Sequence, residues 1–277
     1  MRFTTILGAA LTCTPVLAGA QTATDAVPAQ AKNWSSNIGI ASVVMPSYLG
    51  SNRYRVRTVP ILQLDLKDRV YLGSSTAGIG GGVGVYLLKS STMTWSAELS
   101  SANKRRESHG DGLAGMGTRD GGAFMGTTGS YRIGALTLGA GAAFGLGKDE
   151  GVTGTVNADT KKRLGSRWIT DISSSATFSN KQNMAFDFGV SPIQAARRQA
   201  LIAAGDSRLS VDDGGTYAPK AGLKQATASA SLGFLVSRRT TALGFVTGTR
   251  LGRQPAESPL TRQRNGVMGG VGLAFGI

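Results

Sequence analysis

The chain has 277 residues, of which 30 are Lys or Arg and 16 are Asp or Glu, so its formal net charge is +14 at pH 7. The only cysteine, Cys13, lies in a segment that we expect to be removed, which excludes disulfides and thiolate metal sites from the mature protein. With one histidine a conventional zinc site is not expected, and no later segment approaches the ~20 apolar residues of a membrane helix.

The first segment, MRFTTILGAALTCTPVLAGA at 1–20, has the features of a secretory signal peptide. Arg2 precedes an apolar stretch, and Ala18, Gly19 and Ala20 form a cleavage site of small residues. Residues 21–33 follow as a short flexible lead. Because the protein is expected to be exported, its positive charge predicts contact with phosphate-rich lipid, lipopolysaccharide or cell-wall polymer, and not with nucleic acid.

From residue 34 onward the sequence predicts strands. In 135–147, Leu136, Leu138 and Phe144 alternate with small or weakly polar residues, so an extended chain has one apolar face and one small face. A soluble half-buried strand usually sets charges opposite its apolar face, whereas this pattern is typical of a membrane barrel strand. The alternation predicts twelve strands, at 34–44, 54–66, 69–75, 79–88, 92–102, 121–132, 135–147, 152–164, 167–178, 221–236, 241–252 and 267–277.

The lengths of the connections support a transmembrane antiparallel up-and-down β-barrel over 34–277. Short and long connections alternate if 69–88 is split at a turn at 76–78, which puts both termini on the short-turn side, as bacterial outer-membrane barrels require. The longest connection, at about 179–220, is then an extracellular loop. Ten strands is the alternative, because 69–75 and 152–164 show the weakest patterns. In 241–252 the apolar set expected to face lipid is Leu243, Phe245 and Leu251.

No motif in the chain predicts a catalytic, cofactor-binding or metal site. The sequence GDGLAG at 110–115 matches a dinucleotide fingerprint, but no buried strand precedes it, so we expect a flexible loop. His109 lies beside Glu107 and Asp111, where a solvated surface histidine is the expected reading. A lipid-modifying enzyme centred on His109 is therefore the weakest of the functional hypotheses.

Basic residues gather in two groups of connections. In or near the outer loops they are expected to bridge lipopolysaccharide phosphates through charge-assisted hydrogen bonds; they are Arg53, Arg55, Arg57, Lys104, Arg105, Arg106, Arg197 and Arg198. The periplasmic group is expected to meet anionic headgroups or the cell wall, and it includes Lys67, Arg69, Arg163, Arg167, Arg238 and Arg239. Taken singly, each of these residues also fits a solubilising charge at a strand end.

The segment NWSSNIGIASVVMPSYLGSNRYRVRTVPILQLDLKDRVYLG resembles the start of the MipA/OmpV family of MltA-interacting outer-membrane proteins, through Pro46, Tyr48, Gly50, Ser51, Tyr54 and Pro60. The later segment FGVSPIQAARR is similar to the family's loop signature, through Gly189, Val190, Ser191, Pro192, Gln194 and Ala195. A third segment, AGLKQATASASLGFLVS, resembles a late strand of the family. The last residue departs from the pattern, since Ile277 stands where such barrels usually end in an aromatic.

The resemblance implies a non-enzymatic scaffold in the outer membrane of a Gram-negative bacterium. In the best-known member, the barrel links a lytic transglycosylase to a bifunctional murein synthase. The resemblance transfers no active-site residue and no cofactor, and the motif residues are expected to be structural, with Pro46 and Pro192 shaping loops. Other members are described as porin-like proteins or adhesins, so a small diffusion channel and a surface adhesin are the alternatives.

Overall fold

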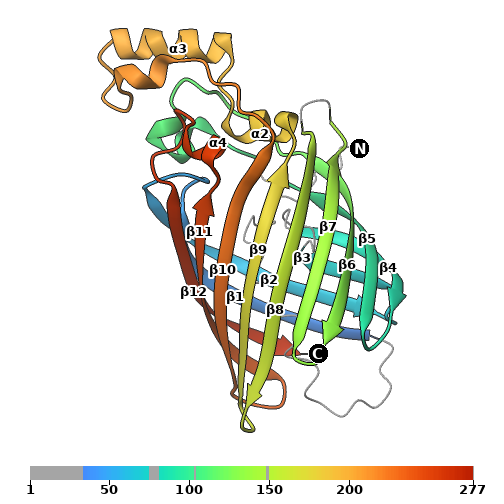
Figure 1. Cartoon of the computed structure of the whole chain (residues 1–277). Helices are drawn as coiled ribbons and strands as arrows, with labels where there is room; N and C mark the ends of the chain where they lie inside the picture. Colours follow the sequence, from blue (N-terminus) through green and yellow to red (C-terminus); the bar gives the residue numbers. More distant parts are fainter. Residues whose placement is uncertain (1–33, 75–80, 103, 148–149, 277) are drawn as a thin grey trace, which may run out of the picture.

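The structure, a computed structural model, describes residues 34–74, 81–102, 104–147 and 150–276. These residues form twelve antiparallel strands in a closed barrel (Figure 1). Each strand pairs with its neighbours in the chain, and the first pairs with the last. The prediction of twelve strands is confirmed over the alternative of ten. The predicted signal peptide and lead at 1–33 and the predicted turn at 76–78 lie outside the described residues.

The strand bounds lie close to the predicted ones. The strands are β1 (Trp34–Pro46), β2 (Tyr54–Leu66), β3 (Val70–Ser74), β4 (Gly81–Lys89), β5 (Met93–Ser101), β6 (Ala123–Ile133), β7 (Leu136–Gly145), β8 (Val152–Leu164), β9 (Trp168–Ser179), β10 (Gly222–Leu235), β11 (Thr240–Leu251) and β12 (Asn265–Gly276). The first and last described strands both have their free ends on the side of the short turns, as the connection lengths predicted.

The outer wall of the barrel is apolar. On β7, Leu136, Leu138 and Phe144 are exposed while Ala143 is buried, so the period-two pattern separates the two faces as predicted. Large exposed apolar side chains recur on the other strands, among them Ile40, Val85, Ile172 and Val271. Among the helices that the structure describes, none is both long and apolar enough to cross a membrane.

On β11 the prediction of the apolar face is wrong. Leu243 and Phe245 pack against an inner cluster formed by Ala41, Val43, Met45, Val59 and Ile61 of β1 and β2. Leu251 is also buried, while Val246 is 50% exposed on the outer wall. An alternating pattern identifies two faces of a strand, but it cannot tell which one lies inside when the neighbouring wall supplies apolar inner partners.

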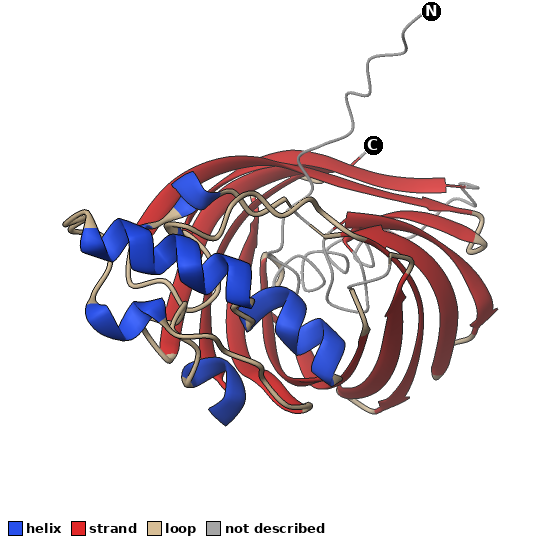
Figure 2. Cartoon of the chain, turned by 90° about the horizontal axis from the view of Figure 1, so that it is seen from above, coloured by secondary structure: helices blue, strands red, loops and turns tan. Residues whose placement is uncertain are grey.

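The long connections fold into a cap at one end of the barrel, which we define as residues 104–122, 180–221 and 252–264 (Figures 1 and 2). Between β9 and β10 lie α2 (Lys181–Phe188), α3 (Pro192–Ala203) and the 3-10 helix η4 (Val211–Gly214). Two further 3-10 helices, η2 (Glu107–His109) and η3 (Asp111–Leu113), follow β5, and α4 (Arg253–Ala256) follows β11. Seen from above, the helices lie over one side of the barrel end (Figure 2).

The sequence SPIQ explains where α3 begins. Ser191 Oγ accepts a hydrogen bond from the amide of Gln194 (3.3 Å), and Gln194 Oε1 accepts one from the amide of Ser191 (2.9 Å). Pro192 occupies the first turn, where its missing N–H costs nothing. The Gln194 amide group also donates to the carbonyl of Met116 (3.1 Å), which ties the start of the helix to the connection between β5 and β6.

Candidate cationic cavity beneath the cap

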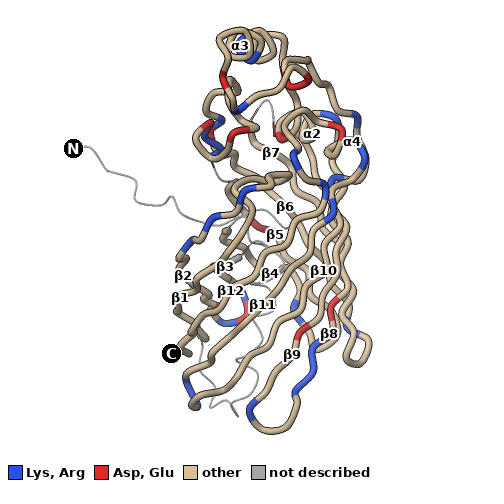
Figure 3. The backbone as a smooth tube through the Cα atoms, turned by 90° about the vertical axis from the view of Figure 1, so that its left-hand side faces the viewer, with Lys and Arg blue, Asp and Glu red and all other residues tan. Residues whose placement is uncertain are grey.

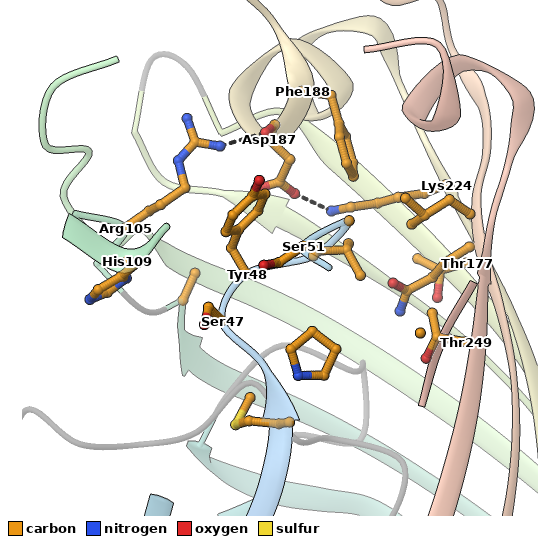
Figure 4. Close-up of a pocket in the computed structure, with 18 of the residues that line it drawn as sticks. Ser47, Tyr48, Ser51, Arg105, His109, Thr177, Asp187, Phe188, Lys224 and Thr249 are labelled. Carbon is orange, nitrogen blue, oxygen red and sulfur yellow. Dashed lines mark hydrogen bonds and ion pairs between the residues drawn. The ribbon is translucent and has the colours of Figure 1, made fainter. Parts of the chain in front are cut away.

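A cavity of about 280 Å³ lies between the cap and the inside of the barrel (Figure 4). Its walls come from the end of β1 and the loop that follows, from the β5–β6 connection and from α2. Four threonines at the cap ends of β8 to β11 also line it: Thr153, Thr177, Thr227 and Thr249. The cavity is therefore built from segments that are far apart in the sequence.

The carboxylate of Asp187, in α2, lies at the centre of the charged part of the cavity. Arg119 Nη1 is 2.8 Å from Asp187 Oδ1, and Lys224 Nζ is 2.5 Å from Asp187 Oδ2. Arg105 Nη1 donates to the backbone carbonyl of Asp187 at 2.5 Å. Burial alone would raise the pKa of Asp187, but the charges of Lys224 and Arg119 outweigh it and hold the pKa well below its ordinary range.

The residues that line the cavity carry more positive than negative charge. The described residues that line the cavity include six Lys or Arg and a single acid, Asp187; the cations are Arg55, Lys104, Arg105, Arg119, Lys224 and Arg264. Lys104 also pairs with Asp120, at 2.6 Å. Burial and the neighbouring charge of Arg119 lower the pKa of Arg105 to about 10. The cavity is therefore strongly positive.

The arginines are held in fixed orientations but keep unused donors. Arg119 stacks on the ring of Phe186, with its guanidinium carbon 3.8 Å from the ring centroid, and it also donates to the Phe186 carbonyl. The Nε atoms of Arg55, Arg105 and Arg119 are buried without a hydrogen-bond partner among the described residues. Buried donors of a charged group are costly to leave unpaired.

The two family motifs, distant in the sequence, meet where the loop between β1 and β2 contacts the cap. Tyr48 packs against a buried cluster that contains Val190 and Ala195 of the second motif, together with Leu113, Met116 and Leu260. Gly50 has a φ of 93°, a conformation that favours glycine, and its carbonyl accepts from the amides of Arg262 (2.7 Å) and Gln263 (3.0 Å). Ser51 Oγ accepts from the amide of Arg53 at 3.1 Å. These motif residues hold the cap together.

The residues expected to contact lipopolysaccharide separate into three groups. Arg53, Lys104, Arg106 and Arg197 are exposed on the cap side. Arg55 and Arg57 lie on the inner face of β2, in line with buried Val59 and Ile61, and Arg105 lines the cavity. The expectation is wrong for Arg198, which is fully buried and donates to the carbonyls of Gly112, Ala114 and Asp213. Its position in a predicted loop suggested an exposed side chain and did not reveal that its guanidinium makes hydrogen bonds inside the cap.

Among the residues that the structure describes, no catalytic set surrounds His109. Its Nδ1 accepts from the amide of Arg106 at 3.4 Å, and burial with the charges of Arg55, Arg57 and Arg106 lowers its pKa. In Figure 4 the imidazole lies at the edge of the cavity, away from Asp187. Asp187 is the one acid among the described lining residues, and it is engaged by Arg119 and Lys224. No group of three His, Cys, Asp or Glu that could hold a metal occurs in the described part of the chain.

The segment 110–115, expected to be a flexible loop, is compact instead. It contains η3, and Leu113 is fully buried in the cluster with Tyr48. A side chain at Gly112 would collide with the hydroxyl of Tyr48. The glycines of this segment therefore serve close packing in the cap.

Asp187, Arg119 and Lys224 come from three separate segments, and no motif in the sequence predicted their meeting. A signal for one of them exists, since Lys224 is the only charged residue of β10. A lone charge in an otherwise uncharged barrel strand requires a partner, but the sequence does not say which one.

Comparison with known proteins places the chain in a family. Residues 38–277 match the profile described as MltA-interacting protein MipA. No match was found among curated proteins.

Solved structures with similar chains include the NanC porin, with 7% identity, a TM-score of 0.44 and coverage of 86% of this chain and 98% of that chain. The translocator domain of the autotransporter NalP from Neisseria meningitidis has 9% identity, a TM-score of 0.44 and coverage of 92% of both chains. The COG4313 outer membrane channel from Pseudomonas putida F1 has 8% identity and a TM-score of 0.42, and the match covers 90% of this chain and 97% of that one. Because the profile spans most of the sequence, this chain belongs to the MipA family of MltA-interacting proteins.

Proposed function

We propose that this protein is an outer-membrane barrel that acts as a non-enzymatic scaffold for murein enzymes in a Gram-negative bacterium. The partners in this proposal are a lytic transglycosylase and a bifunctional murein synthase, bound at the end of the barrel opposite the cap. Membership of the family of MltA-interacting proteins supports the proposal. The observation that carries it is a cluster of exposed arginines at that end.

The barrel itself suits a lipid bilayer. A closed antiparallel sheet satisfies its backbone hydrogen bonds without a free edge, and its outer wall carries large apolar side chains. Trp168 and Phe178, near the two ends of β9, are exposed on that wall, with Ile172 between them. Aromatic side chains near both ends of a spanning strand are typical of the two membrane interfaces.

The short turns at the periplasmic end present positive charge. Arg163 and Arg167 flank the β8–β9 turn, and Arg238 and Arg239 form part of the β10–β11 turn; all four are exposed. These turns are neighbours, since β9 pairs with β10. Basic residues are visible at the short-turn end in Figure 3. A complementary acidic surface on a partner would be steered to this rim.

Replacing Arg238 and Arg239 together with glutamate is expected to weaken capture of the two murein enzymes by about tenfold or more, because like charges across an interface are strongly unfavourable. The measurement is a pull-down from solubilised envelopes, with both enzymes quantified by immunoblot. The matched control reverses two exposed charges at the cap end, Arg197→Glu and Lys220→Glu. Equal recovery by the wild-type and the Arg238/Arg239 variant, or an equal loss in the control, would refute the turn as the contact.

A small diffusion channel is the second candidate, favoured by the small and polar inner faces of β7 to β9, which include Gly139, Gly141, Thr155 and Ser173. If the barrel conducts, we expect salt-dependent current steps in a planar bilayer that favour anions, because cations dominate the cavity beneath the cap. The reversal potential in a salt gradient reports this preference. A persistently silent bilayer with protein shown to be folded by heat-modifiable electrophoresis would exclude the channel.

A further inference from the structure

We propose that the cavity beneath the cap is a binding site for a small solute that carries one oxyanion group, a carboxylate or a phosphate. The inference is independent of the scaffold proposal, because it concerns the opposite end of the barrel and a different set of residues. It rests on the volume and lining of the cavity, on its charge imbalance and on the fixed orientation of its arginines.

The charge imbalance is the first step. Arg105, Arg119 and Lys224 all converge on α2 at Asp187, and a single carboxylate cannot neutralise three cations. Like charges held close together in a site of low dielectric repel each other, and the pKa of Arg105 is lowered by burial first and by the charge of Arg119 second. A second anion in the cavity would reduce the imbalance.

The arginines that line the cavity are the second observation. The Nε atoms of Arg55, Arg105 and Arg119 are buried beneath its surface without a hydrogen-bond partner among the described residues, so these cations are not fully satisfied within the protein. Arginine presents its donors in a planar fork that matches the two oxygens of a carboxylate or phosphate. Because Arg119 is fixed against Phe186 and Arg105 is fixed to the Asp187 carbonyl, little side-chain freedom would be lost on binding.

The uncharged residues that line the cavity indicate the size and polarity of the rest of the solute. Threonines at the cap ends of β8 to β11 line the cavity, together with apolar side chains that include Met45, Phe124 and Phe188. Figure 4 shows Thr177 and Thr249 on the side of the cavity opposite Arg105. A volume of about 280 Å³ is at the lower end of the range for ligand pockets, so it suits a solute of about the size of a monosaccharide. A sugar acid or a sugar phosphate has the required combination of hydroxyls and one anionic group.

The test is isothermal titration calorimetry on the refolded full-length mature barrel in a neutral detergent. The probes are glucuronate, inorganic phosphate and, as the uncharged match to glucuronate, glucose. The buffer is of low ionic strength, since salt screens charge interactions over about 10 Å at 0.1 M. We expect saturable binding of an anion with one site per barrel. Binding of glucuronate alone assigns the site to a carboxylate, and binding of phosphate alone assigns it to a phosphate group. Binding of neither anion, or of glucose as tightly as glucuronate, would overturn the proposal.

Two arginines of β2 provide a matched pair of variants. Arg55 lines the cavity and makes no ion pair among the described residues, so Arg55→Gln should leave the fold intact and weaken anion binding about tenfold. Arg57 lies on the same inner face two positions along the strand but does not line the cavity, so Arg57→Gln should change the affinity by less than about twofold. An equal loss in the two variants would show a general charge effect and contradict a defined site.

A variant that is expected to bind the anion more tightly provides a test that misfolding cannot mimic, because misfolding would weaken binding. Asp187→Asn keeps a side chain of the same shape and removes the carboxylate that competes with the ligand for Arg119 and Lys224. We expect the anion to bind about tenfold more tightly to this variant. Unchanged or weaker binding by Asp187→Asn, with circular dichroism and electrophoretic mobility like those of the wild type, would count against the site.

Discussion

Replacing Arg198 with alanine should loosen the cap by about 3–5 kcal/mol while leaving the barrel assembled. The guanidinium is fully buried and donates to three carbonyls, those of Gly112 (3.0 Å), Ala114 (2.9 Å) and Asp213 (2.6 Å). It thereby joins α3 to two other parts of the cap. The alanine variant leaves these acceptors without their donor and leaves a cavity where the side chain was.

The loss should be confined to the cap. Asp213 keeps a second partner, since Arg262 Nη1 lies 2.6 Å from its Oδ1, so the substitution does not leave an isolated buried carboxylate. The barrel strands are held by their own ladders, which Arg198 does not touch. Hydrogen exchange of the α3 amides should therefore accelerate more than about a hundredfold, while exchange in β9 and β10 stays the same.

The neighbouring residue supplies the control for this experiment. Arg197 is on the same helix but exposed, so Arg197→Ala makes the same chemical change outside the buried network, with an expected effect within about 0.5 kcal/mol. If the α3 amides exchange equally fast in the two variants, the hydrogen bonds of Arg198 do not stabilise the cap. Limited proteolysis of residues 180–221 gives a second measure of the same opening.

Introducing arginine at Ile172 should destabilise the membrane-inserted barrel by about 2–4 kcal/mol. Ile172 is 59% exposed on the outer wall of β9, between Trp168 and Phe178, where a bilayer would surround it with hydrocarbon. A charged side chain there must be desolvated or must distort the bilayer to reach water. The measurement is the free energy of unfolding by guanidinium chloride of barrels refolded into phosphatidylcholine vesicles.

The adjacent residue tests the assignment of inside and outside. Ser173 lies on the inner face and is paired in register with Asp159 of β8. Since a cation there meets a polar lumen and a nearby carboxylate, Ser173→Arg should cost less than about 1 kcal/mol. Equal destabilisation by the two substitutions would mean that the two faces of β9 do not meet different surroundings.

The cap contains one feature that the local sequence predicts and one that it does not. The Ser191–Pro192–Gln194 combination determines by itself where a helix begins, because the side chains satisfy the first free amides. The packing of Tyr48 against Val190 and Ala195 could not be inferred, since more than a hundred residues separate the two motifs. Both motifs are recognisable in the sequence through the family resemblance, but their positions predict two separate loops.

The sequence by itself predicted the positions and order of the strands and the side on which the termini lie, because a period of two and the lengths of connections are local properties of the chain, while the closed barrel decided for twelve strands over ten. The tertiary structure alone decided that Leu243 and Phe245 face inward, that Arg198 is buried, and that Arg105, Arg119 and Lys224 meet at Asp187. Each of these outcomes depends on which residues of a distant segment lie against the side chain. The free energy of burial and of ion pairing comes from those contacts, so it cannot be read from the local sequence pattern.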